Sequence, residues 1–491
     1  MISKINLYVV SALLLGASVD GKDVDSEIVT FSDHIAPIIF NQCVSCHRPN
    51  EAAPFSLMSY RDVQKRGELI ATVIEDRYMP PWHAGSKDYE FQGHRGLSDL
   101  EIDLIGEWVD SGMAEGDPSN LPAMPQYAEG WQLGEPDLVV SMKEGYALYA
   151  EGPDIYRNFA IPLNLEEDKW IQAIEFRPGV RSVVHHSLFY YDTTGEARKR
   201  DEADPIPGFK RMGGGVEREG AIGGWAVGGI PKKLPDGLAY YLPKGSDLIL
   251  STHFHPSGKE ETEISTVGFY FSSEPPKERF TGVQLPPVFG ALAGVDIPAG
   301  ESNYTIEDSF VLPVDVKAFG ISSHAHYLGK SMKMTATLPG GEKKELLSIA
   351  DWDFSWQEQY RYKDYVFLPS GTRLDAEIVW DNSEDNINNP STPPKRVTWG
   401  RESDDEMGSV TLQMVAANPQ EFPKLRQEVR NHVTTATRKA GARRAAGGRN
   451  QARGQGNRSQ FQKRMLDRFD TDRNGVLSPS EREAARKALG R

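Results

Sequence analysis

The sequence predicts a multidomain protein: a small all-α domain, then a mainly-β core, then a short helical module at the carboxyl end. Apolar residues recur at helical spacing over residues 31–40 and 97–112. From residue 134 the pattern changes to alternation of apolar and polar residues, as in residues 170–176 and 374–380, which predicts half-buried strands. A chain of 491 residues with 46 glycines and 32 prolines has room for several such domains.

Charge is distributed unevenly along the chain. The formal net charge is −15, yet residues 421–491 hold 18 basic and 7 acidic residues. The rest of the chain is therefore strongly acidic. Binding to nucleic acid requires basic charge on a folded face, so this composition argues against a nucleic-acid partner.

Residues 1–19 have the pattern of a signal peptide. Lys4 precedes an apolar run over residues 5–15, and small residues follow. The run is shorter than the roughly 20 residues of a membrane-spanning helix, and an uncleaved anchor is the alternative. We expect a periplasmic or secreted protein whose mature chain has no integral membrane span.

The two cysteines stand in a C-x-x-C-H pattern made by Cys43, Cys46 and His47. This spacing predicts covalent attachment of haem c through two thioethers, with His47 as an iron ligand. The alternatives are a disulfide or half of a zinc site, but the chain has no further cysteine to complete a zinc site. Haem attachment also leaves no cysteine for a disulfide.

Residues 25–118, with their helical patterns around the C-x-x-C-H sequence, resemble a class I cytochrome c domain. In that resemblance the loop containing Met79 supplies the sixth iron ligand. His83 and His94 are the alternative axial ligands.

Six of the eleven histidines form three close clusters, and a methionine follows them in the chain. Imidazole suits copper, zinc, iron and nickel, whereas a thioether is a soft ligand that favours Cu(I). The pattern therefore predicts a redox protein with two copper sites. The residues concerned are His185, His186, His253, His255, His324, His326 and Met407.

Residues 153–420 resemble the catalytic core of the copper type II, ascorbate-dependent monooxygenases, because these clusters occur in that family's order. The resemblance implies two packed antiparallel jelly-roll-like sandwiches, at residues 137–278 and 279–420, after a linker at residues 119–136. It implies that one copper, which transfers electrons, is held by His185, His186 and His253. It implies that the catalytic copper, which activates oxygen, is held by His324, His326 and Met407. His255 remains the alternative to His253 as the third ligand.

The expected function is that of an exported copper-dependent monooxygenase. It would use O₂ to hydroxylate an activated C–H bond of a small organic substrate. Electrons would come from its own haem, from ascorbate or another external reductant, or from a redox partner. The alternatives are a non-catalytic haem–copper electron-transfer or copper-binding protein, and a cell-surface scaffold that makes contact through its calcium module.

The carboxyl end contains two further segments. Residues 421–460 have the composition of a basic disordered linker. Residues 461–491 resemble an EF-hand, because oxygen ligands recur at the spacing of its calcium loop. The calcium ligands expected there are Asp470, Asp472, Asn474, Val476, Ser478 and Glu481.

Overall fold

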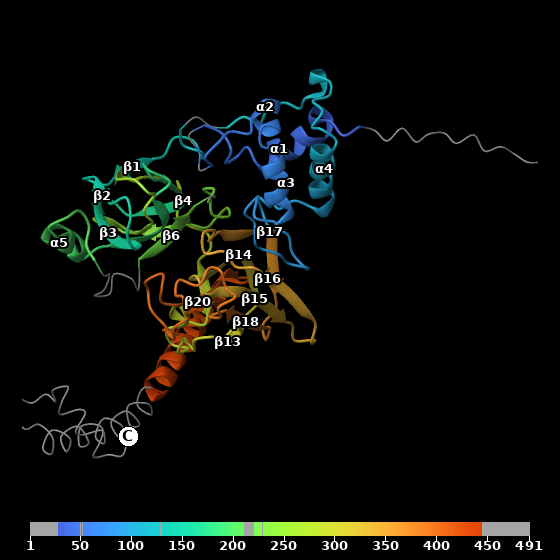
Figure 1. The fold of residues 1–491 in the computed structure, drawn as a ribbon. Helices are drawn as coiled ribbons and strands as arrows, with labels where there is room; N and C mark the ends of the chain where they lie inside the picture. Colours follow the sequence, from blue (N-terminus) through green and yellow to red (C-terminus); the bar gives the residue numbers. More distant parts are fainter. Residues whose placement is uncertain are drawn as a thin grey trace, which may run out of the picture.

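The computed structural model describes residues 28–443, except for residues 50, 52, 128–129, 211–219 and 228. The predicted signal peptide and EF-hand, with its six calcium ligands, lie outside the described residues. The described chain comprises a helical amino-terminal part, two β-sandwiches and a carboxyl-terminal helix (Figure 1).

Short helices form the amino-terminal part. They are η1 (Phe31–Ile35), α1 (Ala36–Gln42), α2 (Tyr60–Gln64), α3 (Gly67–Glu75), α4 (Asp99–Asp110) and η2 (Pro118–Asn120). Helix α4 begins with a capping box, in which Ser98 and Glu101 satisfy each other's backbone N–H groups. Trp108, Phe31 and Ile35 are buried in a common core.

This part is not the separate all-α domain that the sequence predicted for residues 25–118. Gly85 and Ser348 exchange backbone hydrogen bonds of 2.8 Å, and the Gln92 N–H donates to the Arg361 carbonyl at 2.8 Å. Phe91 is buried in the core of the second β-sandwich, whose strands lie within residues 280–416. Residues 82–95 thus extend the edge of that sandwich, and the predicted fold class is wrong here.

The first sandwich consists of two four-stranded antiparallel sheets and a short ribbon. One sheet has the order β1 (Leu138–Ser141), β10 (Thr266–Phe271), β4 (Lys169–Arg177), β7 (Tyr240–Leu242). The other has the order β3 (Ile155–Pro162), β8 (Asp247–Phe254), β5 (Val184–Asp192), β6 (Ala221–Ala226). The ribbon pairs β2 (Tyr146–Leu148) with β9 (Glu261–Glu263), and helix α5 (Glu196–Ala203) follows β5.

The second sandwich repeats this arrangement. One sheet has the order β11 (Phe280–Leu285), β20 (Gly408–Ala416), β14 (Val316–Ala325), β17 (Gln359–Leu368). The other has the order β13 (Tyr304–Val311), β18 (Arg373–Trp380), β15 (Gly329–Thr337), β16 (Lys343–Ile349). The ribbon pairs β12 (Asp296–Ile297) with β19 (Val397–Thr398), and the short helices are η3 (Val288–Gly290) and η4 (Pro419–Glu421).

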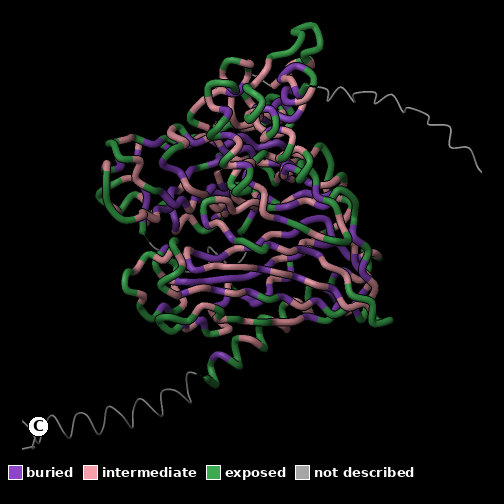
Figure 2. Tube along the Cα trace, turned by 45° about the vertical axis from the view of Figure 1, so that its right-hand side comes forward, coloured by how far each residue is buried: buried purple, intermediate pink, exposed green. Residues whose placement is uncertain are grey.

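Buried positions alternate with less buried ones along many strands (Figure 2). In β18 every second residue is buried. Each pair of sheets therefore encloses its own apolar core. The corrected fold class is mainly β, with jelly-roll-like sandwiches and few helices.

Residues 422–443 are helical, although the sequence predicted a disordered linker over residues 421–460. Phe422, Leu425 and Val429 lie on one helical stripe and pack against the second sandwich. Within the described residues, no helix is both long and apolar enough to cross a bilayer.

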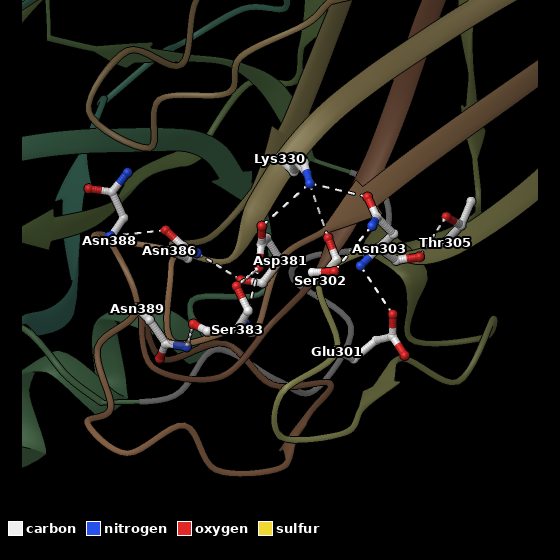
Figure 3. Close-up of polar contacts among 10 residues, drawn as sticks. All are labelled: Glu301, Ser302, Asn303, Thr305, Lys330, Asp381, Ser383, Asn386, Asn388 and Asn389. Carbon is white, nitrogen blue, oxygen red and sulfur yellow. Dashed lines mark hydrogen bonds and ion pairs between the residues drawn. The ribbon is translucent and has the colours of Figure 1, made fainter.

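A polar network fastens the loop after β18 to the start of β15 (Figure 3). The Lys330 ammonium donates to the Ser302 carbonyl at 3.2 Å and lies 3.4 Å from the Asp381 carboxylate. The Asp381 backbone N–H donates to the Leu328 carbonyl at 2.7 Å. These contacts fix the turn that follows His326.

Candidate metal centre

Three histidines converge where β5 and β8 pair in the first sandwich. His186 lies opposite His253, whereas His185 has no residue opposite it on β8, because the register shifts between Val184 and His186. Successive side chains on a regular strand point to opposite faces. The bulge redirects His185, so that both neighbours reach the same point.

These three residues, His185, His186 and His253, are hereafter the three-histidine group. Each offers a ring nitrogen, and the nitrogens lie within 4.8 Å of one another. The Nδ1 atoms of His185 and His186 are 3.1 Å apart. Such convergence of imidazoles suits one metal ion of the copper or zinc type.

The His253 ring is oriented by Asp154 and Tyr156. The Asp154 carboxylate accepts from Nε2 of His253 at 2.9 Å, and the Tyr156 ring stacks on the imidazole at 4.3 Å. Nδ1 of His253 is buried and has no hydrogen-bond partner among the described residues. A carboxylate on one ring nitrogen and a bare lone pair on the other is the arrangement of a metal-binding histidine.

Asp154 is itself held from several sides. Ser403, from the second sandwich, donates to it at 2.6 Å, and His255 lies 2.7 Å from its other oxygen. Burial would raise the pKa of Asp154, but the hydrogen bonds from His253 and Ser403 lower it below its usual range. The side chain of His255 is 61% exposed, so the structure places His253, and not His255, beside the paired histidines.

The second sandwich presents His324, His326 and Met407, hereafter the methionine group. Ala325 of β14 pairs with Gly408 of β20, so the strand register brings His326 and Met407 next to each other. Met407 is 8% exposed. Nδ1 of His326 lies 3.0 Å from the Asp405 carbonyl.

Nδ1 of His324 lies within hydrogen-bond distance of the Gln357 amide oxygen. When Nδ1 donates in this way, Nε2 keeps the lone pair that a metal needs. The same holds for His326, whose Nδ1 donates to a carbonyl. Both histidines of the methionine group therefore have one nitrogen fixed and the other available.

Glu406 organises the backbone of the methionine group. Its buried carboxylate accepts from the N–H groups of His326 at 3.1 Å, Leu328 at 2.7 Å and Met407 at 3.1 Å. The Trp380 indole donates to it at 2.9 Å. Burial raises the pKa of Glu406 to about 8 although these donors lower it.

Burial also keeps His185, His186, His324 and His326 neutral. It lowers the pKa of His185 and of His326 to about 3, and that of His324 to about 4. The pKa of His186 is lowered well below its usual value for the same reason. Neutral imidazole is the form that binds metal, so these residues are ready to do so at neutral pH.

The two groups face each other between the sandwiches. The His186 and His324 ring centroids are 6.4 Å apart. The Phe354 ring lies 4.7 Å from that of His185 and 5.6 Å from that of His326, so it separates the groups on one side. The converging imidazoles of the three-histidine group therefore face His324, and the strand register places His326 and Met407 in the same second group.

The residues predicted to bind haem lie in the amino-terminal part. Both thiols are free, and burial raises the pKa of Cys43 to about 12. Nδ1 of His47 lies 3.1 Å from the Phe55 carbonyl, which leaves Nε2 available to a metal. Met79 is half-buried in the loop after α3. The cysteines and His47 fit the attachment chemistry of a c-type haem.

The alternative axial ligands are placed differently. The His94 ring packs edge-on against Trp82 at 5.0 Å. Nε2 of His83 is buried without a hydrogen-bond partner among the described residues, and burial lowers the pKa of this histidine.

Sequence reasoning missed the residues that support the metal groups. Asp154 is 99 residues from His253 in the chain, and Gln357 is 33 residues from His324. Phe354 and Ser403 were also missed. No local pattern marks these residues, because only the pairing of distant strands brings them to the histidines.

Comparisons with known proteins give no family for this chain: no family model matches, and no curated protein matches. A structure of the infectious bursal disease virus Gx strain is 9% identical, covers 59% of this chain and 75% of its own, and has a TM-score of 0.19. The major capsid protein P2 of bacteriophage PM2 is 12% identical, covers 54% and 98%, and has a TM-score of 0.21. PNGF-II is 10% identical, covers 57% and 65%, and has a TM-score of 0.24.

These findings contradict the resemblances drawn from the motifs. The matched structures include viral capsid proteins, and neither a family model nor a curated relative supports a copper monooxygenase, a cytochrome c or an EF-hand protein. We correct the expectation accordingly and assign the chain to none of these families. At such low TM-scores the likeness to capsid proteins carries no argument about function either.

Proposed function

We propose that this chain is an exported copper-dependent oxidoreductase that uses O₂ to hydroxylate an activated C–H bond of a small organic molecule. The observation that carries the proposal is the pair of facing donor sets. Rings of the three-histidine group and the methionine group approach to 6.4 Å between His186 and His324.

The donors favour copper over the other metals that bind imidazole. A set of three histidines alone would also suit zinc. Met407 adds a soft thioether beside two neutral imidazoles, and that combination favours Cu(I). Two inequivalent donor sets suit a reaction that needs electrons at one site and oxygen at the other.

Bound copper would supply one-electron redox chemistry and a place for O₂. Asp154, Gln357 and the Asp405 carbonyl each fix one nitrogen of a histidine and leave the other for the metal. The Phe354 ring packs between His185 and His326, at 4.7 and 5.6 Å from their rings.

The overall reaction inserts one oxygen atom of O₂ into the C–H bond and releases the other as water. It consumes two electrons and two protons, which a small external reductant such as ascorbate supplies. A haem c on Cys43, Cys46 and His47 would be an internal carrier for these electrons. We also propose a calcium ion at the EF-hand-like sequence of residues 461–491.

Oxygen uptake by the copper-loaded full chain tests the proposal. We expect uptake that depends on a reductant and on an added C–H donor, with one hydroxylated product per O₂ consumed. Met407→Leu should abolish product formation while the three-histidine group still binds copper. Copper that cycles between oxidation states without substrate-dependent uptake would show an electron carrier instead. Binding of zinc in preference to copper at both groups would refute the proposal.

A further inference from the structure

A cavity of about 240 Å³ opens beside the three-histidine group, between the two sandwiches. Its apolar wall contains three aromatic side chains, and its rim contains a guanidinium. Two imidazoles of the three-histidine group also form part of its lining. These residues are Trp225, Tyr327, Phe354, Arg181, His185 and His253. Its volume is near the lower end of small-molecule sites, which begin at roughly 300 Å³.

The cationic group that the cavity offers to a ligand is the Arg181 guanidinium. Arg181 contacts one partner among the described residues, Glu51, at 3.3 Å. Glu51 is shared, because Arg48 binds it more closely, at 2.7 Å. The guanidinium has five N–H donors, so most of them remain available.

The carboxylate in the cavity wall is already engaged. Asp154 accepts from Ser403 at 2.6 Å and has His253 and His255 on its two oxygens at 2.9 and 2.7 Å. A cationic ligand would have to compete with all these contacts. An anionic ligand meets a half-buried arginine that, among the described residues, has one ion pair, at 3.3 Å.

We propose that this cavity binds a small aromatic molecule with an anionic group, of the arylacetate class. The anionic group lies on Arg181, and the ring packs among Trp225, Tyr327 and Phe354. The inference does not rest on the proposed function, since the binding itself needs no metal.

Calorimetric titration of the full-length protein, before and after removal of metal by chelation, tests the inference. The probes are phenylacetate, the cation phenethylamine and the neutral benzyl alcohol. Phenylacetate should bind more tightly than the other two. A charge-assisted contact implies that Arg181→Met weakens phenylacetate binding by roughly tenfold to a hundredfold.

Arg177→Met is the matched control. Arg177 packs over Trp131 at 5.0 Å and does not line the cavity, so its loss should leave binding within about twofold. Ser182→Trp tests the cavity from its exposed rim, where the large ring should block entry and leave the fold intact.

The outcomes separate this inference from the proposed function. Equal binding of the three probes, or equal effects of Arg181→Met and Arg177→Met, would overturn the inference. Tight binding that Ser182→Trp leaves unchanged would also overturn it, because the ligand would then lie elsewhere. Selective, Arg181-dependent binding by a protein that takes up no copper would support the site and refute the copper enzyme.

Discussion

Replacing Asp154 with asparagine should weaken copper binding at the three-histidine group without disturbing the methionine group. Asp154 accepts from Nε2 of His253 at 2.9 Å and thereby directs Nδ1 toward the other imidazoles. Loss of such a carboxylate partner weakens metal binding by about tenfold to a hundredfold. That corresponds to about 1.4–2.7 kcal/mol of binding free energy.

Competition titration with a Cu(I) chelator measures the two sites as separate steps. His255→Ala is the control, because His255 touches the opposite oxygen of Asp154 and its side chain is 61% exposed. We expect its effect to stay below about threefold, as for an exposed pair. If His255→Ala removes the copper while His253→Ala retains it, the assignment of the third ligand is wrong.

Three further predictions concern stability. Glu406→Ala should lower the free energy of unfolding by about 3 kcal/mol, because it leaves several buried N–H donors unpaired. Chemical denaturation measures this loss, and a loss below about 1 kcal/mol would contradict the prediction. Gly408→Ala should cost about 1–3 kcal/mol in the same assay, because the added Cβ would lie 2.4 Å from the Trp380 ring; an unchanged midpoint would count against this packing. Burial lowers the pKa of His185, His324 and His326, whereas a histidine in the unfolded chain has a pKa of about 6.5. Below that pH the unfolded chain binds more protons than the folded chain, so stability falls as pH drops. Unfolding of metal-free protein at pH 7 and pH 5 should show a loss of at most about 1.4 kcal/mol per pH unit for each such histidine, and equal stability at both pH values would contradict the burial.

The histidine clusters and the methionine could be recognised in the sequence, but the residues that orient the histidines could not. Histidines at adjacent or alternate positions are visible as a local pattern, and so is a methionine near the start of a strand. Asp154 and Gln357 act through contacts that depend on strand pairing across long stretches of chain. Their role therefore follows only from the folded structure.

The errors in the predicted fold have the same origin. The helical spacing around residues 31–40 and 97–112 was visible, whereas the pairing of Gly85 with Ser348 spans most of the described chain. The helix at residues 422–443 was missed because its segment is rich in charged and small residues. Its few apolar side chains, including Leu425, stabilise it only by packing against the second sandwich.

X-ray absorption at the copper edge of the reduced, fully loaded protein tests the two-site account most directly. The account predicts two coppers per chain, mainly nitrogen neighbours, and on average about half a sulfur neighbour per copper, which Met407 supplies. Met407→Leu should remove the sulfur signal and leave the nitrogen shell of the three-histidine group unchanged. A single copper per chain, or a wild-type spectrum without sulfur, would contradict the account.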